Sequence, residues 1–411
     1  MRILMLTTYF APDSAANAVI MTQLAEDLAA LGHEVTVLTS FPHYDADRVP
    51  ERYRGRLWTK ERGGSGDVRR VFLFVPRRKN RILGRILSYA SWNVLSFLAG
   101  SLAPRSDLVF VPSPPLTNGA VGFMISRLRG VPFVYNVQDI YPDIAVRLGV
   151  LRNRSLIAAS GLLERFVYRS AAAVSVISEG FKDNLLAKGV PFRKVRVIPN
   201  FADTAFIRPL DRRNRMSTEL GLDDRFVALF AGNVGLSQGL GSVLDAAELL
   251  KDRPEIVVHI VGNGAAKAAL VEEARRRGLT NVMLRPFFPY PELPEMYAAS
   301  DVGLVPLKRG ITDESVPSKV FSIMAAARPV VACVEEGSDT SRLLGQSGCG
   351  LRVPPEDPQA LAEALVSLSR DREAGRRMGE KGRIWAERHH SRAPIAEAYG
   401  KLFLDVLNGG V

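Results

Sequence analysis

The sequence predicts an α/β protein of two doubly wound, Rossmann-like domains that face each other across a central cleft. Three observations lead to this fold class. At 411 residues the chain exceeds the length of an ordinary single domain. Apolar strands alternate with helices through residues 1–200, and the same alternation restarts at Phe226. Two successive βα arrays of similar size predict two parallel sheets, each covered by helices.

The first array consists of runs that are apolar throughout, as is typical of parallel strands buried on both faces. A helix with Leu24, Leu28 and Leu31 at helical spacing follows the first strand and ends near Gly32. The expected strands of this array are Ile3–Leu6, Val35–Leu38, Leu108–Val111, Phe133–Val137, Val174–Ile177 and Val195–Ile198.

Residues 199–209, which begin and end with proline, are interpreted as a linker, and the polar run Asp211–Arg215 follows it. The amphipathic helix Pro358–Arg370 and a last helix near Pro394–Leu407 close the second array. We therefore expect a first domain at residues 1–200, a second at 201–390, and a C-terminal helix at 391–411 that packs back towards the first domain. The expected strands of the second array are Phe226–Phe230, Ile256–Val261, Val282–Leu284, Val302–Val305, Val330–Ala332 and Gly350–Val353.

Composition and motifs exclude several classes of protein. A hydrophobic fraction of 47% and a charged fraction of 24% are ordinary for a soluble globular protein. The two cysteines, Cys333 and Cys349, are too few for a disulfide framework and have no histidines near them for a zinc site. The chain contains neither a Walker A loop nor a complete G-x-G-x-x-G motif, which argues against a dinucleotide oxidoreductase.

The net charge of +11 favours an anionic partner, either a phosphorylated small molecule or a membrane surface, and we expect no nucleic acid. From Val68 to Ser106 there are eight Lys or Arg residues and no Asp or Glu. Within this stretch, residues 86–103 are uncharged and carry Tyr89, Trp92 and Phe97, but four serines and an asparagine make them too polar to span a bilayer. Two interpretations stay open: a helix packed inside the first domain, or a basic, aromatic face on an anionic membrane.

The first residues, Met1–Leu6, are better explained as a buried strand than as a signal peptide, because polar residues interrupt the apolar run. We therefore expect a cytoplasmic protein, peripheral on the inner face of the plasma membrane.

A phosphate site is predicted in the second domain, where Pro317, Ser318 and Lys319 precede a helix. Proline is favoured in a first helical turn and serine is a good cap. The free N–H groups of a helix start suit a phosphate, and Lys319 adds a positive charge beside them. The strand Val302–Val305 lies upstream, so this helix opens at the edge of the sheet where parallel sheets bind ligands.

Glycines mark a second part of this predicted ligand site. The segment from Gly232 to Leu240 follows the strand that opens the second array, and its glycines let the backbone approach a ligand. The alternative is a tight turn that binds nothing. The donor-side residues that we expect are Gly232, Asn233, Gly235, Gln238, Gly262, Phe287, Pro317 and Ser318.

In the first domain, Asp139 follows a strong strand and is expected at the carboxyl edge of its sheet, facing the cleft. Asp143 follows Pro142 and is expected to cap a short helix. Loops at the same edge supply the expected acceptor-side residues Ser14, Asn17, Ser113 and Tyr141.

Several segments, in order along the chain, carry a resemblance to one family. They are Gly32–Val37, Val197–Asn200, Val261–Gly264, Leu293–Val302 and Arg328–Val331. Over essentially its whole length the chain resembles the retaining family-4 glycosyltransferases of GT-B fold. Within that family, the segment Gly232–Leu240 and the run from Pro317 to Ala325 resemble the L-fucosamine transferases of bacterial O-antigen and capsule assembly.

This resemblance implies transfer of a sugar, such as N-acetylfucosamine, with retention of configuration. The implied donor is a nucleotide-sugar, UDP-linked, in the second domain, and the implied acceptor is a glycan or an undecaprenyl-diphosphate-linked glycan in the first. As catalytic residues it implies Glu314 beside the donor sugar, Asp139 beside the reacting carbon and Lys319 at the diphosphate. No cofactor or metal is expected, although the loop triplet Asp45-Ala46-Asp47 matches an acidic metal-binding triplet of some sugar transferases.

The chain departs from the family pattern at three positions. Ser322 stands where a second glutamate is usual, and Asn233 and Gln238 stand where the family places Arg and Lys. Two other functions therefore remain open at this point: a sugar-nucleotide epimerase on a similar two-domain fold, and a non-catalytic nucleotide-sugar binder.

Overall fold

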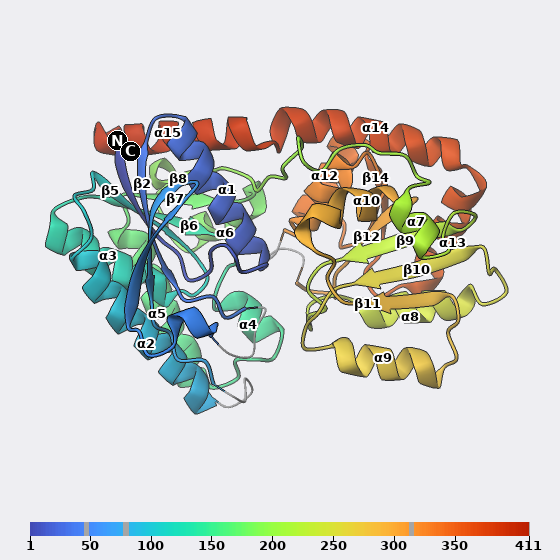
Figure 1. Ribbon diagram of the computed structural model, residues 1–411, viewed down its shortest axis with the longest axis horizontal. Coiled ribbons are helices and arrows are strands. Elements are labelled where there is room, and N and C mark those ends of the chain that lie inside the picture. The colour runs from blue at the N-terminus through green and yellow to red at the C-terminus, as the bar shows by residue number, and fades with distance from the viewer. Residues whose placement is uncertain (45–48, 77–81, 312–315, 411) are drawn as a thin grey trace. The chain divides into compact units, whose positions relative to one another are not determined.

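The computed structural model describes residues 1–44, 49–76, 82–311 and 316–410. It divides into two compact units (Figure 1), each considered separately below. Unit 1 comprises Met1–Asn200 and Arg392–Val411, and unit 2 comprises Phe201–Ser391. Each is an α/β unit around one largely or wholly parallel sheet, which confirms the predicted fold class.

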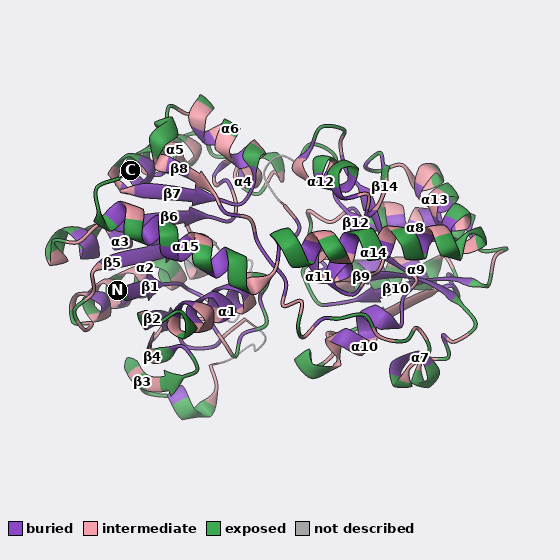
Figure 2. Cartoon of the chain, turned by 90° about the horizontal axis from the view of Figure 1, so that it is seen from above, coloured by how far each residue is buried: buried purple, intermediate pink, exposed green. Residues whose placement is uncertain are grey.

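Unit 1 contains an eight-stranded sheet in the order β3-β4-β2-β1-β5-β6-β7-β8. Only β3 is antiparallel to its neighbour. The strands are β1 (Arg2–Leu6), β2 (Glu34–Ser40), β3 (Trp58–Gly63), β4 (Gly66–Val71), β5 (Leu108–Pro112), β6 (Phe133–Val137), β7 (Ala173–Val176) and β8 (Val195–Val197). Buried residues line the central strands (Figure 2), as their apolar sequences require.

The hairpin of β3 and β4 was not predicted from the sequence. Its strands pair from Trp58 opposite Val71 to Gly63 opposite Gly66. Five of the six β3 residues are polar or glycine, so no apolar run marks this edge strand. The hairpin buries Arg70, whose Nε donates to a Glu61 carboxylate oxygen at 2.8 Å.

Helices cover both faces of the unit 1 sheet. Helices α1 and α15 pack together on one face, and α2, α3 and α5 lie side by side on the other (Figure 1). The helices are α1 (Ala16–Ala30), α2 (Ile82–Ser101), α3 (Thr117–Arg129), α4 (Asp143–Arg147), α5 (Arg154–Ser170), α6 (Glu179–Ala187) and α15 (Arg392–Leu407).

Although it comes last in the sequence, α15 is part of unit 1. The Arg392 guanidinium pairs with Asp27 of α1 at 2.7 Å, and the Tyr399 phenol accepts a hydrogen bond from Asn136 at 3.0 Å. The ring of Phe403, which is fully buried, lies 5.2 Å from that of Phe110 on β5. The helix therefore completes the core beside β5 and β6.

The structure decides part of the question about residues 68–106. Trp92 is fully buried on α2, and its indole N–H donates to Asn118 Oδ1 at 2.7 Å. Trp92 and the buried Arg70 therefore cannot contact a membrane, and for these two residues the interpretation as packed side chains holds. Tyr89 remains 40% exposed. Within the described residues, no helix is long and apolar enough to cross a membrane.

Unit 2 contains a six-stranded, wholly parallel sheet in the order β11-β10-β9-β12-β13-β14. Its strands are β9 (Phe226–Ala231), β10 (Ile256–Val261), β11 (Val282–Arg285), β12 (Val302–Pro306), β13 (Val330–Cys333) and β14 (Gly350–Val353). Its helices are α7 (Arg215–Glu219), α8 (Leu240–Leu249), α9 (Lys267–Arg276), α10 (Leu293–Ala298), α11 (Lys319–Ala325), α12 (Asp339–Ser347), α13 (Pro358–Arg370) and α14 (Arg372–His389).

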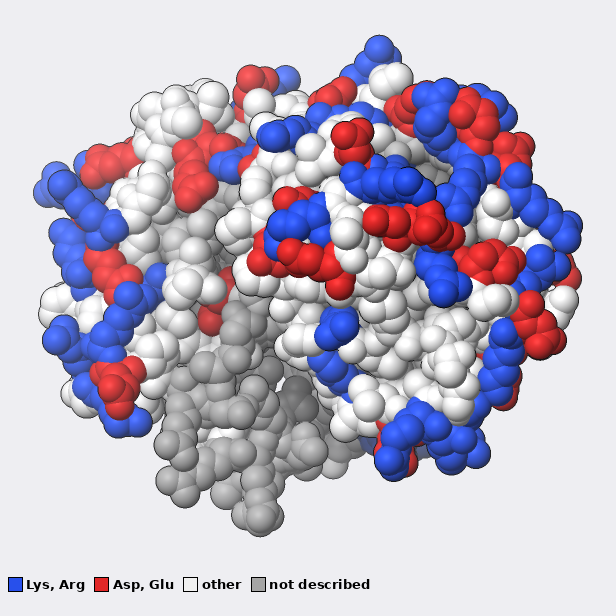
Figure 3. All heavy atoms as spheres, turned by 45° about the vertical axis from the view of Figure 1, so that its right-hand side comes forward, with Lys and Arg blue, Asp and Glu red and all other residues white. Residues whose placement is uncertain are grey.

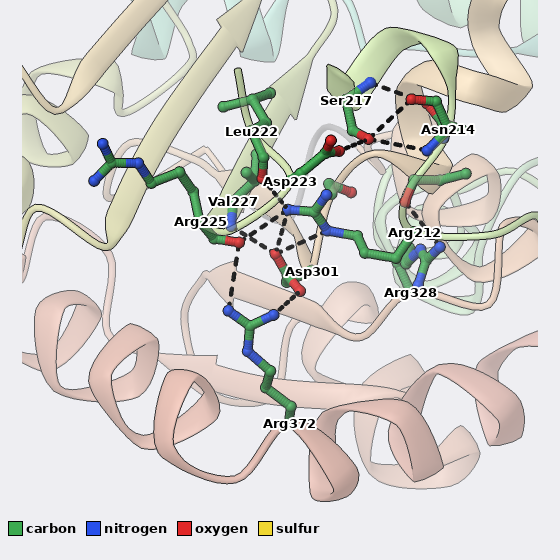
Figure 4. Close-up of polar contacts among 12 residues, drawn as sticks. Arg212, Asn214, Ser217, Leu222, Asp223, Arg225, Val227, Asp301, Arg328 and Arg372 are labelled. Carbon is green, nitrogen blue, oxygen red and sulfur yellow. Dashed lines mark hydrogen bonds and ion pairs between the residues drawn. The ribbon is translucent and has the colours of Figure 1, made fainter. Parts of the chain in front are cut away.

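Ion pairs centred on Asp301 hold the amino end of this sheet together (Figure 4). Asp301 directly precedes β12, and one of its carboxylate oxygens accepts from the Arg212 guanidinium at 3.0 Å and from the Val227 N–H at 2.7 Å. The other oxygen accepts from Arg372 at 3.3 Å. Arg212 lies in the polar run that follows the predicted linker, so Asp301 fixes that run to β9, β12 and α14.

Candidate active site

Two glycine-rich loops meet at the carboxyl end of the unit 2 sheet. The loop after β9 and the loop after β10 are joined by hydrogen bonds from Val234 N–H to Asn263 O at 2.8 Å and from Ala266 N–H to Val234 O at 3.0 Å. A Cβ atom on Gly262 would collide with the Gly232 carbonyl. Glycine is therefore required at position 262 for the close approach of these loops.

Lys319, the first residue of α11, places its ammonium group against the first of these loops. Its Nζ donates to Gln238 Oε1 at 2.5 Å and lies 3.9 Å from the centroid of the Phe230 ring. Burial lowers the pKa of Lys319 to about 7. Among the described residues, no carboxylate pairs with Lys319. The structure thus holds a poorly hydrated cation among neutral partners, where an incoming anion would be strongly attracted.

The helix start around Lys319 differs from the prediction. Pro317 is buried and precedes α11 instead of lying in its first turn. Ser318 occupies the cap position, but its side chain makes no capping hydrogen bond, so the predicted cap is wrong. Helix α11 has only seven residues, and the Lys319 ammonium is therefore the stronger feature of this site.

Ser322 lies one turn further along α11 and hydrogen-bonds to the phenol of Tyr297 on α10. Burial raises the pKa of Tyr297 to about 12, so the phenol is neutral at physiological pH. A neutral hydroxyl pair therefore occupies the position where the family pattern has a carboxylate.

The remaining donor-side residues lie at the same end of the unit 2 sheet or in the segments that follow it. Asn233 is exposed, Gly235 is buried and Phe287 is half-buried in the segment after β11. Sequence reasoning missed Lys267, whose Nζ donates to Gly262 O and Asn263 Oδ1 at 2.7 Å each. A lysine directly after a glycine loop was the available signal.

At the carboxyl end of the unit 1 sheet, Asp139 follows β6. Burial raises the pKa of Asp139 to about 7. Within the described part of the chain, no hydrogen bond or ion pair reaches its carboxylate. The preceding residue is fixed, since Gln138 donates to Asn136 at 2.8 Å and accepts from Asn200 at 2.7 Å. Asp139 therefore leaves a rigid strand end with its carboxylate unpaired.

The acceptor-side residues fall into two groups. Ser113 is buried, and its hydroxyl accepts from the Gln138 N–H at 3.1 Å, which makes it part of the packing. Tyr141 and Ser14 lie in the loops after β6 and β1. Asn17 lies in the first turn of α1, and both polar atoms of its amide are shielded from solvent and lack a hydrogen-bond partner among the described residues.

Two further findings concern this end of unit 1. Asp143 begins α4 but does not cap it; its carboxylate pairs with Lys188 at 2.8 Å, so the predicted capping role is wrong. Sequence reasoning also missed the stack of Tyr9 on His43, with ring centroids 5.2 Å apart, after β1 and β2. An aromatic ring three residues after the end of each strand was the available signal.

Some predicted residues lie outside the described residues, namely Glu314 and the Asp45-Ala46-Asp47 triplet. Across the described ranges, no group of three His, Cys, Asp or Glu side chains could hold a metal ion. Cys333 and Cys349 are both buried free thiols.

Comparisons with known proteins place the chain in a family. Residues 17–200 match the glycosyl transferase 4-like domain, and residues 212–385 match the glycosyl transferases group 1 domain. The putative colanic acid biosynthesis glycosyl transferase WcaI of Escherichia coli (strain K12) is 30% identical over 374 residues, which cover 89% of this chain and 91% of that protein. The chain belongs to the family-4 glycosyltransferases. A second relative of this glycosyltransferase, the probable glycosyltransferase WbjE of Pseudomonas aeruginosa, is 32% identical over 72% of this chain and 75% of its own length.

Solved structures show the same fold. Sucrose-phosphate synthase from Thermosynechococcus elongatus superposes with a TM-score of 0.79 at 19% identity, covering both chains completely. Anabaena Alr3699/HepE, in complex with UDP and glucose, superposes with a TM-score of 0.74 at 17% identity, covering 98% of this chain and 100% of that one. This family-4 glycosyltransferase therefore has the GT-B fold.

Proposed function

We propose that this glycosyltransferase transfers a sugar from a UDP-linked donor, bound by unit 2, to a glycan or undecaprenyl-diphosphate-linked acceptor, bound by unit 1. The pathway that we propose is the assembly of a bacterial cell-surface polysaccharide at the cytoplasmic face of the membrane. The name of the WcaI relative supports this pathway, and the HepE complex with UDP and glucose supports the donor class.

The observation that carries the proposal is the environment of Lys319. Its ammonium lies between the Phe230 ring and the Gln238 side chain, at the sheet end where the two glycine loops meet. When the bond between the sugar carbon and the diphosphate oxygen breaks, negative charge gathers on the leaving diphosphate. A poorly hydrated ammonium that is already in place stabilises this charge without reorganisation. Because Lys319 supplies the positive charge, we propose a reaction that needs no divalent metal.

In unit 1, we propose that the Asp139 carboxylate stabilises the positive charge that develops on the reacting sugar carbon. Its lack of a described partner supports this role, because an unpaired carboxylate remains available to a ligand. We also propose retention of configuration, on the resemblance of the whole chain to the retaining family-4 enzymes. Transfer of N-acetylfucosamine is proposed on the resemblance of Gly232–Leu240 and Pro317–Ala325 to the L-fucosamine transferases. We further propose that Ser322 and Tyr297 bind the ribose hydroxyls in place of the usual carboxylate.

The proposal is tested by incubating the full chain with a panel of UDP-sugars, with and without a lipid-diphosphate-linked glycan. We expect release of UDP that depends on the acceptor, a product of retained configuration by NMR, and full activity in excess chelator. Formation of an epimer without acceptor, or binding of UDP-sugar without turnover, would contradict the transfer. Loss of activity in chelator that manganese or magnesium restores would contradict only the metal-independent step.

A further inference from the structure

The outer face of helix α2 consists of apolar residues. Leu87, Val94 and Leu98 follow each other at spacings of seven and four residues, so they lie along one stripe of the helix. Leu102, in the turn directly after α2, donates its N–H to the Leu98 carbonyl at 3.2 Å and continues this stripe. Val94 is 59% exposed, Leu98 51% and Leu102 79%. Single exposed apolar residues are normal on a protein surface. A continuous stripe of large ones indicates a surface that binds a membrane or another protein.

Helices α3 and α5 extend this stripe. Met124 and Leu128 are exposed on α3, and Leu162 and Phe166 are exposed on α5. Contacts connect the three helices. The rings of Phe123 and Phe166 lie 4.9 Å apart, and the Arg129 guanidinium at the end of α3 donates to the Gly100 carbonyl at the end of α2 at 2.9 Å. The exposed sides of the three helices therefore form one surface, the α2–α3–α5 face.

The charges on this face are of one sign. Arg127, Arg165 and Arg169 are exposed beside the apolar residues of α3 and α5. The three helices contain a single acidic residue, Glu164, which is buried and pairs with Lys188 at 2.7 Å. The outer helices of unit 2 differ, since arginines on α9 and α14 pair with glutamates one turn away, and the side of unit 2 that Figure 3 brings forward shows both signs interspersed.

We propose that the α2–α3–α5 face docks the protein on an anionic lipid bilayer. An apolar stripe that meets the boundary of the acyl chains, flanked by arginines at headgroup level, is the arrangement that binds such a surface. A second copy of the chain fits less well, because a two-fold dimer through this face would bring arginines against arginines. This inference specifies the membrane location within the proposed function but does not depend on the transfer chemistry.

Sedimentation with lipid vesicles tests the proposal on the full chain. The wild type should bind vesicles of phosphatidylcholine with phosphatidylglycerol and be released by salt, and should bind pure phosphatidylcholine much more weakly. A variant with Arg127→Gln, Arg165→Gln and Arg169→Gln should bind anionic vesicles about 100-fold more weakly, at about fivefold per arginine.

A second variant with Val94→Gln, Leu98→Gln and Leu102→Gln removes the apolar stripe. We expect its vesicle affinity to fall about 100-fold, which at about fourfold per CH₂ group corresponds to about one lipid-buried CH₂ group per side chain. The matched control places the same substitution at three exposed apolar residues of unit 2, Leu249→Gln, Val271→Gln and Ile384→Gln, and should bind as the wild type does. Release of UDP with a water-soluble acceptor should match the wild type in all three variants, which shows that they fold.

Docking is rejected if the wild type does not sediment with anionic vesicles, or if the control loses as much affinity as the α2 variant. It is also rejected if sedimentation velocity shows a wild-type dimer that the α2 variant dissociates, because the face is then an interface between copies. Vesicle binding without any sugar transfer would leave docking intact and contradict the proposed transfer alone.

Discussion

The amino and carboxyl ends of each sheet differ in whether their charged side chains are paired. At the amino ends, charged groups are paired: Asp107 accepts from Arg2 at 2.6 Å in unit 1, and Asp301 accepts from Arg212 and Arg372 in unit 2. At the carboxyl ends, each unit has a poorly hydrated charged group with no partner of opposite charge among the described residues. These are the Asp139 carboxylate in unit 1 and the Lys319 ammonium in unit 2.

The difference separates stability from function. A pair such as Asp301 and Arg212, with side chains only 11% and 17% exposed, fixes segments distant in sequence. Removing one partner would leave a poorly hydrated charge alone, which destabilises the fold. A poorly hydrated charge without a partner among the described residues lowers the stability of the fold. Such a charge indicates a functional site, because a ligand of opposite charge can pair with it. Variants at the two ends should therefore fail in different assays.

The largest effect is expected for Lys319→Ala. Removing a preorganised charge that stabilises the leaving diphosphate should lower kcat/KM about 1,000-fold. The fold should persist, because the variant also removes a poorly hydrated cation. The measurement is steady-state release of UDP beside a thermal melt. The control is Lys251→Ala, a lysine after α8 towards the amino end of the sheet, which should leave kcat/KM unchanged.

A second variant distinguishes loss of charge from loss of shape at Lys319. Because Lys319 Nζ touches Gln238 Oε1, a lysine at position 238 can deliver an ammonium to nearly the same place. Adding Gln238→Lys to Lys319→Ala should restore part of the lost kcat/KM. A fully active Lys319→Ala variant would remove this residue from the mechanism and end the comparison for unit 2.

The next effect is on stability, and it concerns Asp301→Ala. Loss of the carboxylate leaves Arg212 unpaired, so the free energy of unfolding should fall by about 3 kcal/mol. Activity per folded molecule should be unchanged. Urea unfolding followed by circular dichroism measures the free energy of unfolding. An active-site titration measures the activity per folded molecule. The matched control is Asp224→Ala, whose pair with Arg213 is exposed and should contribute less than about 1 kcal/mol.

The fold class and the strand sequence could be predicted because continuous apolar runs report burial on both faces of a parallel sheet. The β3–β4 hairpin could not, because its stability depends on a pair between Arg70 and Glu61 that no local pattern reveals. Asp301 was visible only as the residue before a strand, since its partner Arg212 lies 89 residues away in the sequence.

The candidate site shows the same limit. The sequence placed Lys319 and Asp139 after strands, so the ends of the sheets at which they lie could be derived. The neutral contacts of Lys319 with Gln238 and Phe230 could not be derived, because Gln238 lies 81 residues away from Lys319 in the sequence. Ser113 shows what position alone leaves out: its place after β5 suggested a ligand contact, and the structure adds that its hydroxyl accepts from the Gln138 N–H.

A somewhat smaller effect is expected for Asp139→Asn, which tests the comparison in unit 1. The amide keeps the shape but cannot stabilise positive charge on the sugar, so kcat should fall about 100-fold. The KM for the donor should change little, because Lys319 and the glycine loops of unit 2 remain. Asp143→Asn is the control, since that carboxylate is already paired with Lys188. Equal losses in the two variants would show that Asp139 contributes through packing.

The smallest effect is expected in the pH dependence of kcat/KM, which tests Asp139 and Lys319 together. Burial raises the pKa of Asp139 to about 7 and lowers that of Lys319 to about 7, so both free-enzyme groups titrate near neutrality. Below pH 7 Asp139 takes up its proton and loses the charge that the reaction needs. Above pH 7 Lys319 loses its proton and with it the attraction for the diphosphate.

The profile should therefore rise and fall about tenfold per pH unit on the two sides of a maximum near pH 7. Each limb belongs to one residue and can be removed separately. Asp139→Asn should flatten the acid limb and leave the alkaline one, whereas Lys319→Arg should remove the alkaline limb, because a guanidinium stays charged. If both variants kept both limbs at reduced activity, other groups would control the titration, and the unpaired charges at the two sheet ends would have no kinetic role.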